Sequence, residues 1–449
     1  MNAKNGTYHT LLARHEAMRL RRQLLSPGPT APATDRDTPY APAGTAYDGT
    51  AYDGTAYDGP ADQQTILRHL DKVTPFDELI THLYRALFAR HPSLRSLFPA
   101  SMEFQQAHLA RALWYLIEHL HRPDDVARTF MRLGRDHRKL GLLPAQYTAF
   151  ETALREALRV RAAADWTVEL EQAWLRMLRF GVTAMVRGAE AALREPPFWR
   201  ATVTDHQLLA PDLALLRLRP HEAFPHRAGQ YVTLEVPRLP HTWRPFYPAG
   251  AYGTEGDLEL HVRRTGAGGV SDALVNGTAV GDEIRIGPPR GDLTLHDGPQ
   301  DRLHLVAWDT GWSAMKALIQ ELDRRTRSAP AHRVGAVRLH IGAETLAGLY
   351  DTDCLTELER RHSWLTVVPV IDTSQARACD RLVHELTRHP SHTAVRTLMA
   401  GPPALVHTLT AALTHAGTPA EHLRHDLPPN NPDAPRPAAV TVSATSRHG

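Results

Sequence analysis

The chain has 449 residues, with 51 Lys or Arg against 49 Asp or Glu and a formal net charge of +2. This length exceeds one ordinary domain, so we expect two or three compact units. The near balance of charge provides no broad basic field, which argues against nucleic acid as a partner.

The cysteine count and the hydropathy pattern also limit the class of protein. Cys354 and Cys379 are too few for a disulfide framework and form no Cys-x-x-Cys pair, which suits a reducing cytoplasm. No apolar run approaches the roughly 20 residues that span a bilayer, and the N-terminus has no signal-peptide pattern. We therefore predict a cytoplasmic protein without a membrane span, and the sequence leaves its oligomeric state open.

Residues 1–64 are predicted to form a disordered arm. AYDGT occurs at 46–50 and 51–55, and AYDGP follows at 56–60. A five-residue period rich in Gly and Asp buries little apolar surface and fits no solenoid repeat. The Pro-rich tail at 428–449 is predicted to be disordered for the same compositional reason.

Residues 65–196 show only helical periodicity, which predicts an all-α domain. Thr74 is the expected N-cap of a helix with Pro75 at its first position. Further helical patterns cover about 103–121, 124–140, 144–161 and 167–194.

One histidine in this domain is predicted to face inward, because His137 shares a helical stripe with apolar residues. The stripe comprises Val126, Phe130, Leu133, His137 and Leu140. Taken alone, this pattern more often marks a hydrogen-bonded core histidine than a metal ligand.

Tyr84 and Gln105 also fall on inward stripes. Buried polar groups without partners cost about 1 to 3 kcal/mol each. Three such residues in one small domain therefore predict a polar ligand in its interior.

The remaining chain divides into two further predicted domains. Residues 197–299 contain short alternating strands separated by Gly, Pro and Asp, which predict an antiparallel β-barrel or sandwich. Residues 300–427 alternate apolar strands with helices, which predicts a parallel sheet with crossover helices.

The helical domain resembles the globin domain of flavohaemoglobins. LYRALFARHPSLRSLFP is similar to the segment with the distal tyrosine and a haem-packing phenylalanine, here Tyr84 and Phe98. GRDHRKLGLLPAQY is similar to the segment with the proximal histidine and a tyrosine ten residues later, here His137 and Tyr147.

The resemblance assigns a role to each polar group. It implies haem b with His137 as the iron ligand and with Tyr84 and Gln105 contacting bound dioxygen. A proximal Tyr and Glu pair strengthens the histidine ligand in the family, and Glu190 lies near the position of the acid. For Tyr147, a packing role and a proximal role are equally compatible with the sequence.

The last two domains resemble ferredoxin-NADP reductase, as in flavohaemoglobins, which implies an FAD-type β-barrel and an NAD(P)-type α/β domain. AGQYV at 228–232, GGVS at 268–271 and WRPFYPAG at 243–250 correspond to the flavin motifs. The implied FAD-binding residues are Gly229, Gln230, Tyr231, Arg244, Phe246, Tyr247, Gly269, Val270 and Ser271. The family's Arg-x-Tyr-Ser motif is altered here, because no small hydroxyl residue follows the aromatic position.

The nucleotide loop departs further from the family pattern. LVAWDTGWSAMKAL has Trp308 and Asp309 where related reductases have two glycines that admit phosphate and nicotinamide. The implied NAD(P)-binding residues that remain are Thr310, Gly311, Gly401 and Pro402.

The resemblance implies an oxidoreductase in which NAD(P)H reduces FAD, FAD reduces haem, and haem-bound dioxygen converts nitric oxide to nitrate. The altered motifs leave a second interpretation open: a haem-binding gas sensor or binding protein with a degenerate reductase module. An interaction protein with an empty globin pocket is a third, and it leaves Tyr84, Gln105 and His137 unexplained.

Overall fold

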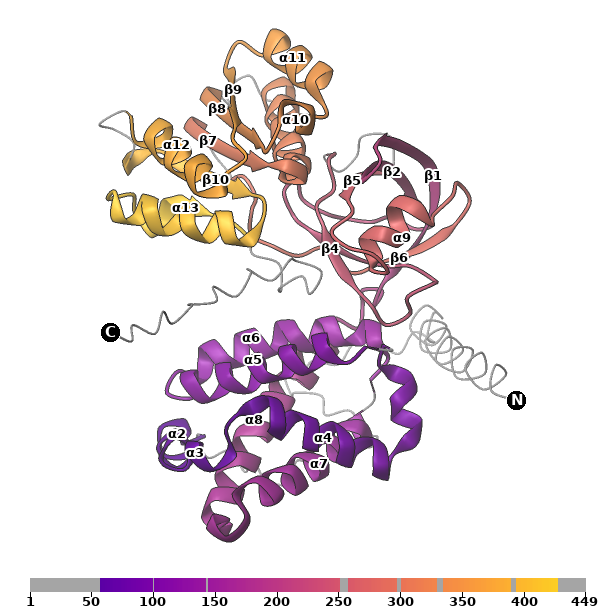
Figure 1. The fold of residues 1–449 in the computed structure, drawn as a ribbon, viewed down its shortest axis with the longest axis vertical. Coiled ribbons are helices and arrows are strands. Elements are labelled where there is room, and N and C mark those ends of the chain that lie inside the picture. The colour runs from indigo at the N-terminus through magenta and orange to yellow at the C-terminus, as the bar shows by residue number, and fades with distance from the viewer. Residues whose placement is uncertain are drawn as a thin grey trace, which may run out of the picture. The chain divides into compact units, whose positions relative to one another are not determined.

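The computed structural model describes residues 57–99, 101–142, 144–250, 257–296, 300–328, 334–388 and 393–426. It divides into two compact units, Met1–Pro197 and Phe198–Gly449 (Figure 1). The first two AYDGT repeats and the predicted tail at 428–449 lie outside the described residues.

Unit 1 is helical throughout its described residues, as predicted. Its α-helices are α2 (Gly59–Arg68), α3 (Leu70–Val73), α4 (Phe76–Arg90), α5 (Glu103–His119), α6 (Pro123–His137), α7 (Pro144–Ala162) and α8 (Val168–Ala191). Short 3-10 turns are η1 (Pro92–Leu97), η2 (Arg138–Leu140) and η3 (Ala163–Asp165).

The unit begins earlier than the predicted boundary at residue 65. The Asp58 side chain accepts a hydrogen bond from the Ala61 amide at 3.1 Å and caps α2, and Pro60 lies in the first turn. Tyr57 stacks on Phe180 of α8 with ring centroids 4.7 Å apart. The prediction of a disordered arm was therefore wrong for the third repeat, because its Asp-Gly-Pro sequence begins a helix.

The predicted N-cap at Thr74 was also wrong by one residue. Thr74 ends α3, and Pro75 in an extended conformation precedes α4. Proline disfavours the helical conformation of the residue before it, which places Thr74 outside the new helix.

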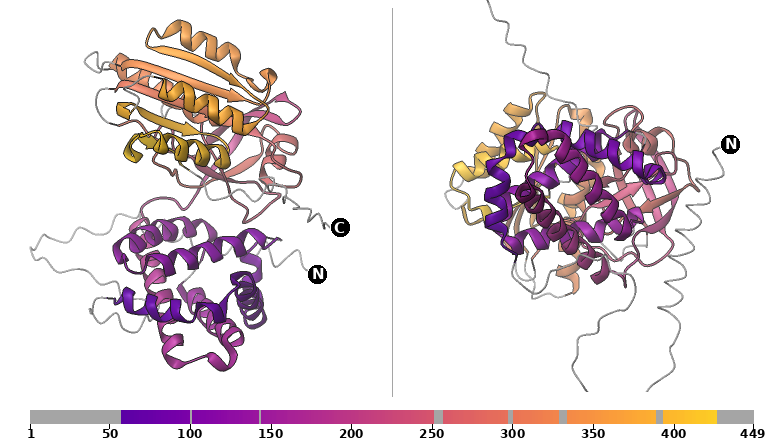
Figure 2. Two further views of the ribbon diagram at one scale, coloured as in Figure 1. Left: turned by 60° about the vertical axis from the view of Figure 1, so that its left-hand side comes forward. Right: turned by 90° about the horizontal axis from the view of Figure 1, so that it is seen from below.

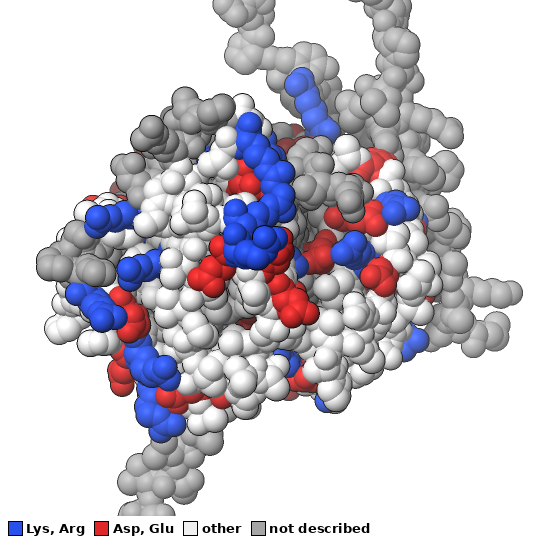
Figure 3. Space-filling model, turned by 90° about the horizontal axis from the view of Figure 1, so that it is seen from above, with Lys and Arg blue, Asp and Glu red and all other residues white. Residues whose placement is uncertain are grey.

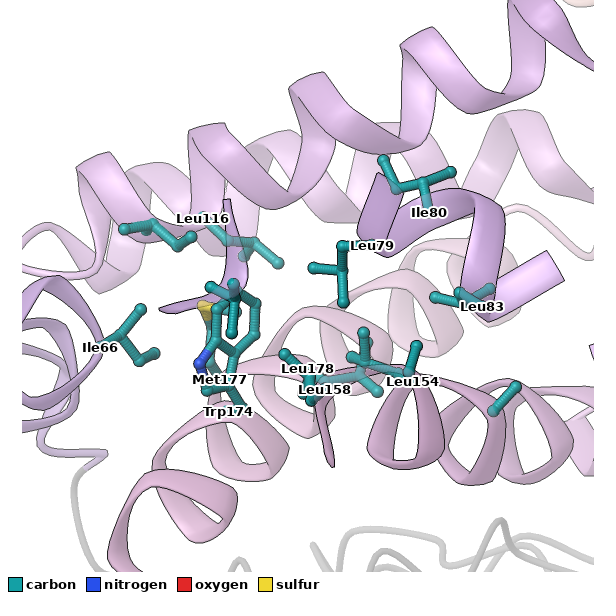
Figure 4. Packing of buried hydrophobic residues seen from close by; sticks show 14 of the residues in the cluster. Ile66, Leu79, Ile80, Leu83, Leu116, Leu154, Leu158, Trp174, Met177 and Leu178 are labelled. Atoms are coloured by element: carbon teal, nitrogen blue, oxygen red, sulfur yellow. The ribbon is translucent and has the colours of Figure 1, made fainter. Parts of the chain in front are cut away.

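The core of unit 1 is formed by inward stripes of several helices around Trp174 of α8, which is fully buried (Figure 4). Leu79 and Leu83 of α4 and Leu154 and Leu158 of α7 face one another in this cluster. Burying a side chain of this size stabilises the fold by about 1.5 to 3 kcal/mol.

Two glycines let α6 approach α8 closely. A Cβ added at Gly134 would lie 1.9 Å from the Met185 carbonyl oxygen, and one at Gly188 would lie 1.9 Å from that of Met131. Neither helix could carry a side chain at these contacts. The crossing therefore fixes the position of α6, the helix that ends at His137.

The first part of unit 2 is a six-stranded antiparallel sheet in the order β4-β3-β6-β1-β2-β5. Its elements are β1 (Trp199–Ala210), β2 (Leu213–Pro220), β3 (Val232–Glu235), β4 (Arg244–Phe246), β5 (Leu258–Arg263), α9 (Val270–Asn276) and β6 (Glu283–Ile286). An isolated bridge between Pro248 and Leu260 connects the two ends of the sheet, so it is a nearly closed barrel rather than a sandwich. The sequence did not predict β4 or α9.

The second part is a five-stranded parallel sheet in the order β11-β10-β7-β8-β9. Its strands are β7 (Gln300–Trp308), β8 (Val334–Ala343), β9 (Leu365–Ile371), β10 (Arg396–Ala400) and β11 (Leu423–Arg424). Its α-helices are α10 (Trp312–Ser328), α11 (Thr352–Arg361), α12 (Gln375–Thr387) and α13 (Pro403–His415), with 3-10 turns η4 (Asp309–Gly311), η5 (Leu346–Gly348) and η7 (Ala420–His422). Helices α10 and α11 cover one face and α12 and α13 the other (Figure 2).

On the face of unit 2 in Figure 3, basic and acidic side chains lie beside one another without a wide field of one sign. Several of them form ion pairs, such as Arg324 with Glu321 at 2.7 Å. Among the described residues, no helix is long and apolar enough to cross a membrane.

Candidate functional site

Tyr84 lies on the buried side of α4, as its stripe predicted, and its side chain is 8% exposed. Its ring contacts Phe88 and Phe98, with centroids 5.7 and 5.6 Å away. No hydrogen bond joins its hydroxyl to another described residue. Burial raises the pKa of Tyr84 well above its usual value, so the hydroxyl remains a proton donor at neutral pH.

His137 is the last residue of α6, which continues as η2 and ends at Gly141 in the left-handed conformation (φ +70°). Its Nδ1 hydrogen-bonds the Leu133 carbonyl at 2.9 Å. That bond orients the ring and leaves Nε2 with no partner among the described residues.

Burial lowers the pKa of His137, although the residue retains some accessible surface. Both observations fit a side chain that lines an internal space, because such a group is desolvated and yet has an uncovered side. The lowered pKa favours the neutral imidazole, the form that donates a lone pair to a metal.

Gln105 lies in the first turn of α5, and its Oε1 is buried and accepts no hydrogen bond from any residue that the structure describes. An orphaned buried acceptor is uncommon and calls for an explanation, such as a ligand or water. Phe98 and Tyr147 pack against the same core as Tyr84 and are themselves only half-buried. This part of the globin unit thus keeps both apolar surface and a polar group for a further contact.

The structure does not support the predicted role of Glu190. Burial raises the pKa of Tyr147, whereas Glu190 is exposed near the end of α8. No hydrogen bond joins them within the described residues. The role of Glu190 stays a prediction, because helical periodicity does not fix the register of a long helix to within one residue.

The predicted flavin residues of the barrel lie at or beside β3, β4 and α9. Gln230 uses its side chain locally: Oε1 accepts from the Arg227 amide at 2.9 Å, and Nε2 donates to the Gly291 carbonyl at 3.4 Å. Tyr231 pairs with Arg290 through backbone hydrogen bonds of 2.8 Å. Gly229 adopts φ +86°, and a Cβ there would lie 1.8 Å from the Leu293 carbonyl oxygen.

In the altered flavin motif, Arg244 is buried and donates to the Trp243 carbonyl at 3.0 Å. Phe246 is half-buried. The Tyr247 hydroxyl donates to the Asp426 carbonyl at 3.0 Å, and burial raises the pKa of Tyr247 well above its usual value. The bulky replacement for serine therefore anchors the C-terminal segment.

In the glycine turn before α9, the space around Gly268 is open, whereas the Ser271 hydroxyl already has a protein partner. Gly268 adopts φ +75° with open space around it, and its amide donates to Asp272 at 2.8 Å. Gly269 precedes α9, whose first residue Val270 is fully buried. Ser271 accepts from the Thr265 amide at 3.2 Å.

The predicted nucleotide residues cluster at the carboxyl ends of β7 and β10. Thr310 and Gly311 form η4 with Asp309, and a Cβ at Gly311 would lie 2.2 Å from the Ala400 carbonyl oxygen. Gly401 and Pro402 follow β10 and lead into α13. These four residues therefore lie at one edge of the sheet, and their role in binding NAD(P) stays a prediction.

The side chains that occupy this edge include residues that sequence analysis missed. Arg263 of β5 donates from Nε to both Asp309 oxygens at 2.7 Å. Lys316 of α10 forms ion pairs with Glu259 of β5 at 2.8 Å and with Asp351 at 3.0 Å. Glu259 and Arg263 alternate with buried Leu258, Leu260 and Val262, so the sequence pattern indicated only a solvent-facing side of the strand.

Comparison with known proteins agrees with this division. Residues 81–185 match the globin family, and residues 200–295 match the oxidoreductase FAD-binding domain. A flavohemoprotein of Pseudomonas aeruginosa is 26% identical over 263 residues, which cover 55% of this chain and 66% of that protein. The reductase component of phenol 2-monooxygenase from a Pseudomonas species is 28% identical over 174 residues, 39% of this chain and 47% of that one.

A solved structure extends the fold match to both units. The crystal structure of flavohemoglobin from Malassezia yamatoensis with bound FAD and heme has a TM-score of 0.67 at 17% identity, covering 81% of this chain and 98% of that one. The chain thus combines a region that matches the globin family with a region that matches the oxidoreductase FAD-binding domain, and its overall fold is similar to that of a flavohemoglobin. Its relatives in sequence are matched over less than two thirds of their length in both cases above.

Haem and FAD are the cofactors that the two matched families imply. For haem, the residues of the globin region fit: among the described residues, nothing hydrogen-bonds His137 Nε2 or the buried Gln105 Oε1. For FAD, the open turn at Gly268 fits, although the Tyr247 and Ser271 hydroxyls already have protein partners.

For NAD(P)H, which the reductase fold leads one to expect, the fit fails. Trp308 and Asp309 stand where the phosphate loop needs backbone without side chains, and Asp309 places a carboxylate at an anion site.

Proposed function

We propose that the globin unit binds haem b through His137 and that the chain is a nitric oxide dioxygenase-like oxidoreductase. When bound, haem supplies an iron centre at which dioxygen binds and converts nitric oxide to nitrate. The observation that carries the proposal is that Gln105 Oε1 is buried with no hydrogen-bond partner in the described part of the chain, where the Tyr84 hydroxyl and His137 Nε2 have none either.

The chain's own residues have distinct parts in this proposal. His137 Nε2 would hold the iron while the Leu133 carbonyl fixes the ring orientation. Tyr84 would donate a hydrogen bond to the bound gas, which carries partial negative charge, and its raised pKa keeps the proton in place. Phe98 would cover the macrocycle with apolar surface.

FAD is the proposed electron relay, and the match of residues 200–295 to an FAD-binding domain supports it. NAD(P)H does not fit as the source of electrons, because Trp308 and Asp309 occupy the carboxyl edge of the parallel sheet where it would bind. This observation favours a second candidate: a haem protein that binds diatomic gases and is not reduced by NAD(P)H.

Absorption spectra of the purified full chain test both candidates. A Soret band together with flavin absorbance near roughly 450 nm, and nitric oxide consumption with nitrate as product, would support the dioxygenase. A Soret band with no nitric oxide consumption under any reductant would leave the gas-binding candidate. Absence of a Soret band after haem addition would contradict both.

A further inference from the structure

The topology of the parallel sheet predicts where a dinucleotide would bind. From β7 the chain runs outward through β8 to β9, and it then returns to β10 on the other side of β7. Ligands of open α/β sheets bind at the carboxyl ends of the strands where the order reverses. That point lies between Trp308, the last residue of β7, and Gly401, which follows β10.

Trp308 fills this point. Its side chain is 5% exposed and belongs to the core between the sheet and α12 and α13. A Cβ added at Gly342 would lie 2.1 Å from its six-membered ring, and one at Gly401 would lie 2.9 Å from its Cβ. Gly342 of β8 therefore faces the indole, and Gly401 after β10 faces the Cβ and backbone of Trp308, so neither glycine is open to a ligand.

Asp309 closes the loop on the barrel side. It has φ +51°, a left-handed conformation that a non-glycine residue rarely adopts. Its carboxylate is held by Arg263 of β5, and Arg263 in turn donates to Asp212 at 2.8 Å. Burial raises the pKa of Asp309 even against the attraction of Arg263, so the carboxylate depends on that guanidinium.

A second ion pair between the barrel and the α/β part lies beside the Arg263–Asp309 pair. Lys316 bridges Glu259 of the barrel and Asp351 of the α/β part. Burial raises the pKa of Glu259, but hydrogen bonds and charges of His261 and Lys316 outweigh it and bring the pKa to about 2. Glu259 and Lys316 are therefore both charged at neutral pH.

We propose that this edge is a clasp rather than a dinucleotide site: Trp308 occupies the switch point, and the Arg263–Asp309 and Glu259–Lys316 pairs tie the barrel to the α/β part. NAD(P)H is excluded as long as Trp308 and Asp309 are present. All of these residues lie in unit 2, so the clasp does not depend on haem binding to unit 1.

Binding of NADH and NADPH to the full chain, measured by isothermal titration calorimetry, tests the proposal. We expect no saturable binding by the native sequence up to about 1 mM, the upper end of ordinary KM values. The double variant Trp308→Gly, Asp309→Gly should bind at least about tenfold more tightly than that limit. Asp323→Asn is the matched control, because Asp323 also pairs with an arginine, Arg327, on the same domain.

A second measurement does not depend on the tryptophan variant folding. Asp309→Asn keeps the packing and weakens the clasp, so hydrogen exchange should rise in both β5 and η4, while Asp323→Asn should leave them unchanged. Saturable binding by the native sequence below about 100 µM, or a folded double variant that gains no binding, would overturn the proposal. Unchanged exchange in Asp309→Asn would overturn the clasp.

Discussion

The inward-facing polar residues of the globin unit and those at the carboxyl edge of the α/β part differ in what they contact. In the globin unit, Gln105 and His137 retain atoms with no partner among the described residues. At the edge, Asp309 and Lys316 are held by residues of the barrel. A site that keeps polar groups available fits a ligand, whereas one that satisfies them internally stabilises the fold.

The largest effect is expected at the haem ligand. His137→Gly should abolish haem retention and the Soret band, because no other residue replaces the lone pair of Nε2. Added imidazole should restore the band if the pocket itself is intact. His119→Ala is the control, since His119 forms the same type of bond to a carbonyl four residues earlier, at 3.0 Å.

Normal haem content in His137→Gly without imidazole would show that His137 is not the haem ligand. The polar groups of the globin unit would then no longer differ from those of the α/β edge in being available to a ligand.

The next effect tests whether the helix crossing positions the pocket. Gly134→Ala would place a methyl group 1.9 Å from the Met185 carbonyl oxygen, so we expect a loss of about 3 kcal/mol in unfolding free energy. Haem affinity should fall with it, because α6 must move. Gly266→Ala has nothing within 4 Å of the added Cβ and serves as control; equal stability of the two variants would contradict the close crossing.

His340 of β8 allows a further comparison with His137. Neither of its ring nitrogens has a hydrogen-bond partner among the described residues, and the side chain is fully buried. Burial, with His304 and Arg338 nearby, lowers the pKa of His340 to about 3. The unfolded state therefore binds the proton first, and stability falls as pH drops below about 6.5, by up to about 1.4 kcal/mol per pH unit. The loss ends near the folded pKa.

Urea unfolding of the full chain at pH 7 and pH 5 measures this slope for the transition of unit 2. His340→Leu should reduce it while keeping the core apolar. An unchanged slope in that variant would show that other groups cause the acid sensitivity.

The smallest effect concerns the distal hydrogen bond. Tyr84→Phe removes the donor but keeps the ring packed against Phe88 and Phe98. Loss of about 1.4 kcal/mol should raise the dioxygen dissociation rate about tenfold. Tyr115→Phe, which removes a hydroxyl hydrogen-bonded to Thr129, is the control for a nonspecific effect; equal dioxygen rates in native protein and Tyr84→Phe would contradict the distal role.

Local periodicity predicted most of the fold. The stripes of α4 and α6 predicted that Tyr84 and His137 face inward, because 3.6-residue spacing determines which side chains share a helix face. Alternation of strands with helices predicted the parallel sheet and placed Gly311 and Gly401 at one edge. These features depend on residues close together in the chain.

The sequence could not predict features that depend on distant partners. Periodicity does not fix the register along α8, so it did not decide whether Glu190 reaches Tyr147, and β4 was missed because three residues carry too little pattern. The third AYDG copy was assigned to the arm because its anchor, Phe180, lies more than 120 residues away.

The sequence by itself determined the domain order, the inward histidine and the presence of Trp308 and Asp309 in the nucleotide loop. Only the tertiary structure decided what those two residues do, because their partners Gly342, Gly401 and Arg263 come from separate strands. The identity of a side chain is local, but whether it is left available or held by a partner depends on which distant segments pack around it.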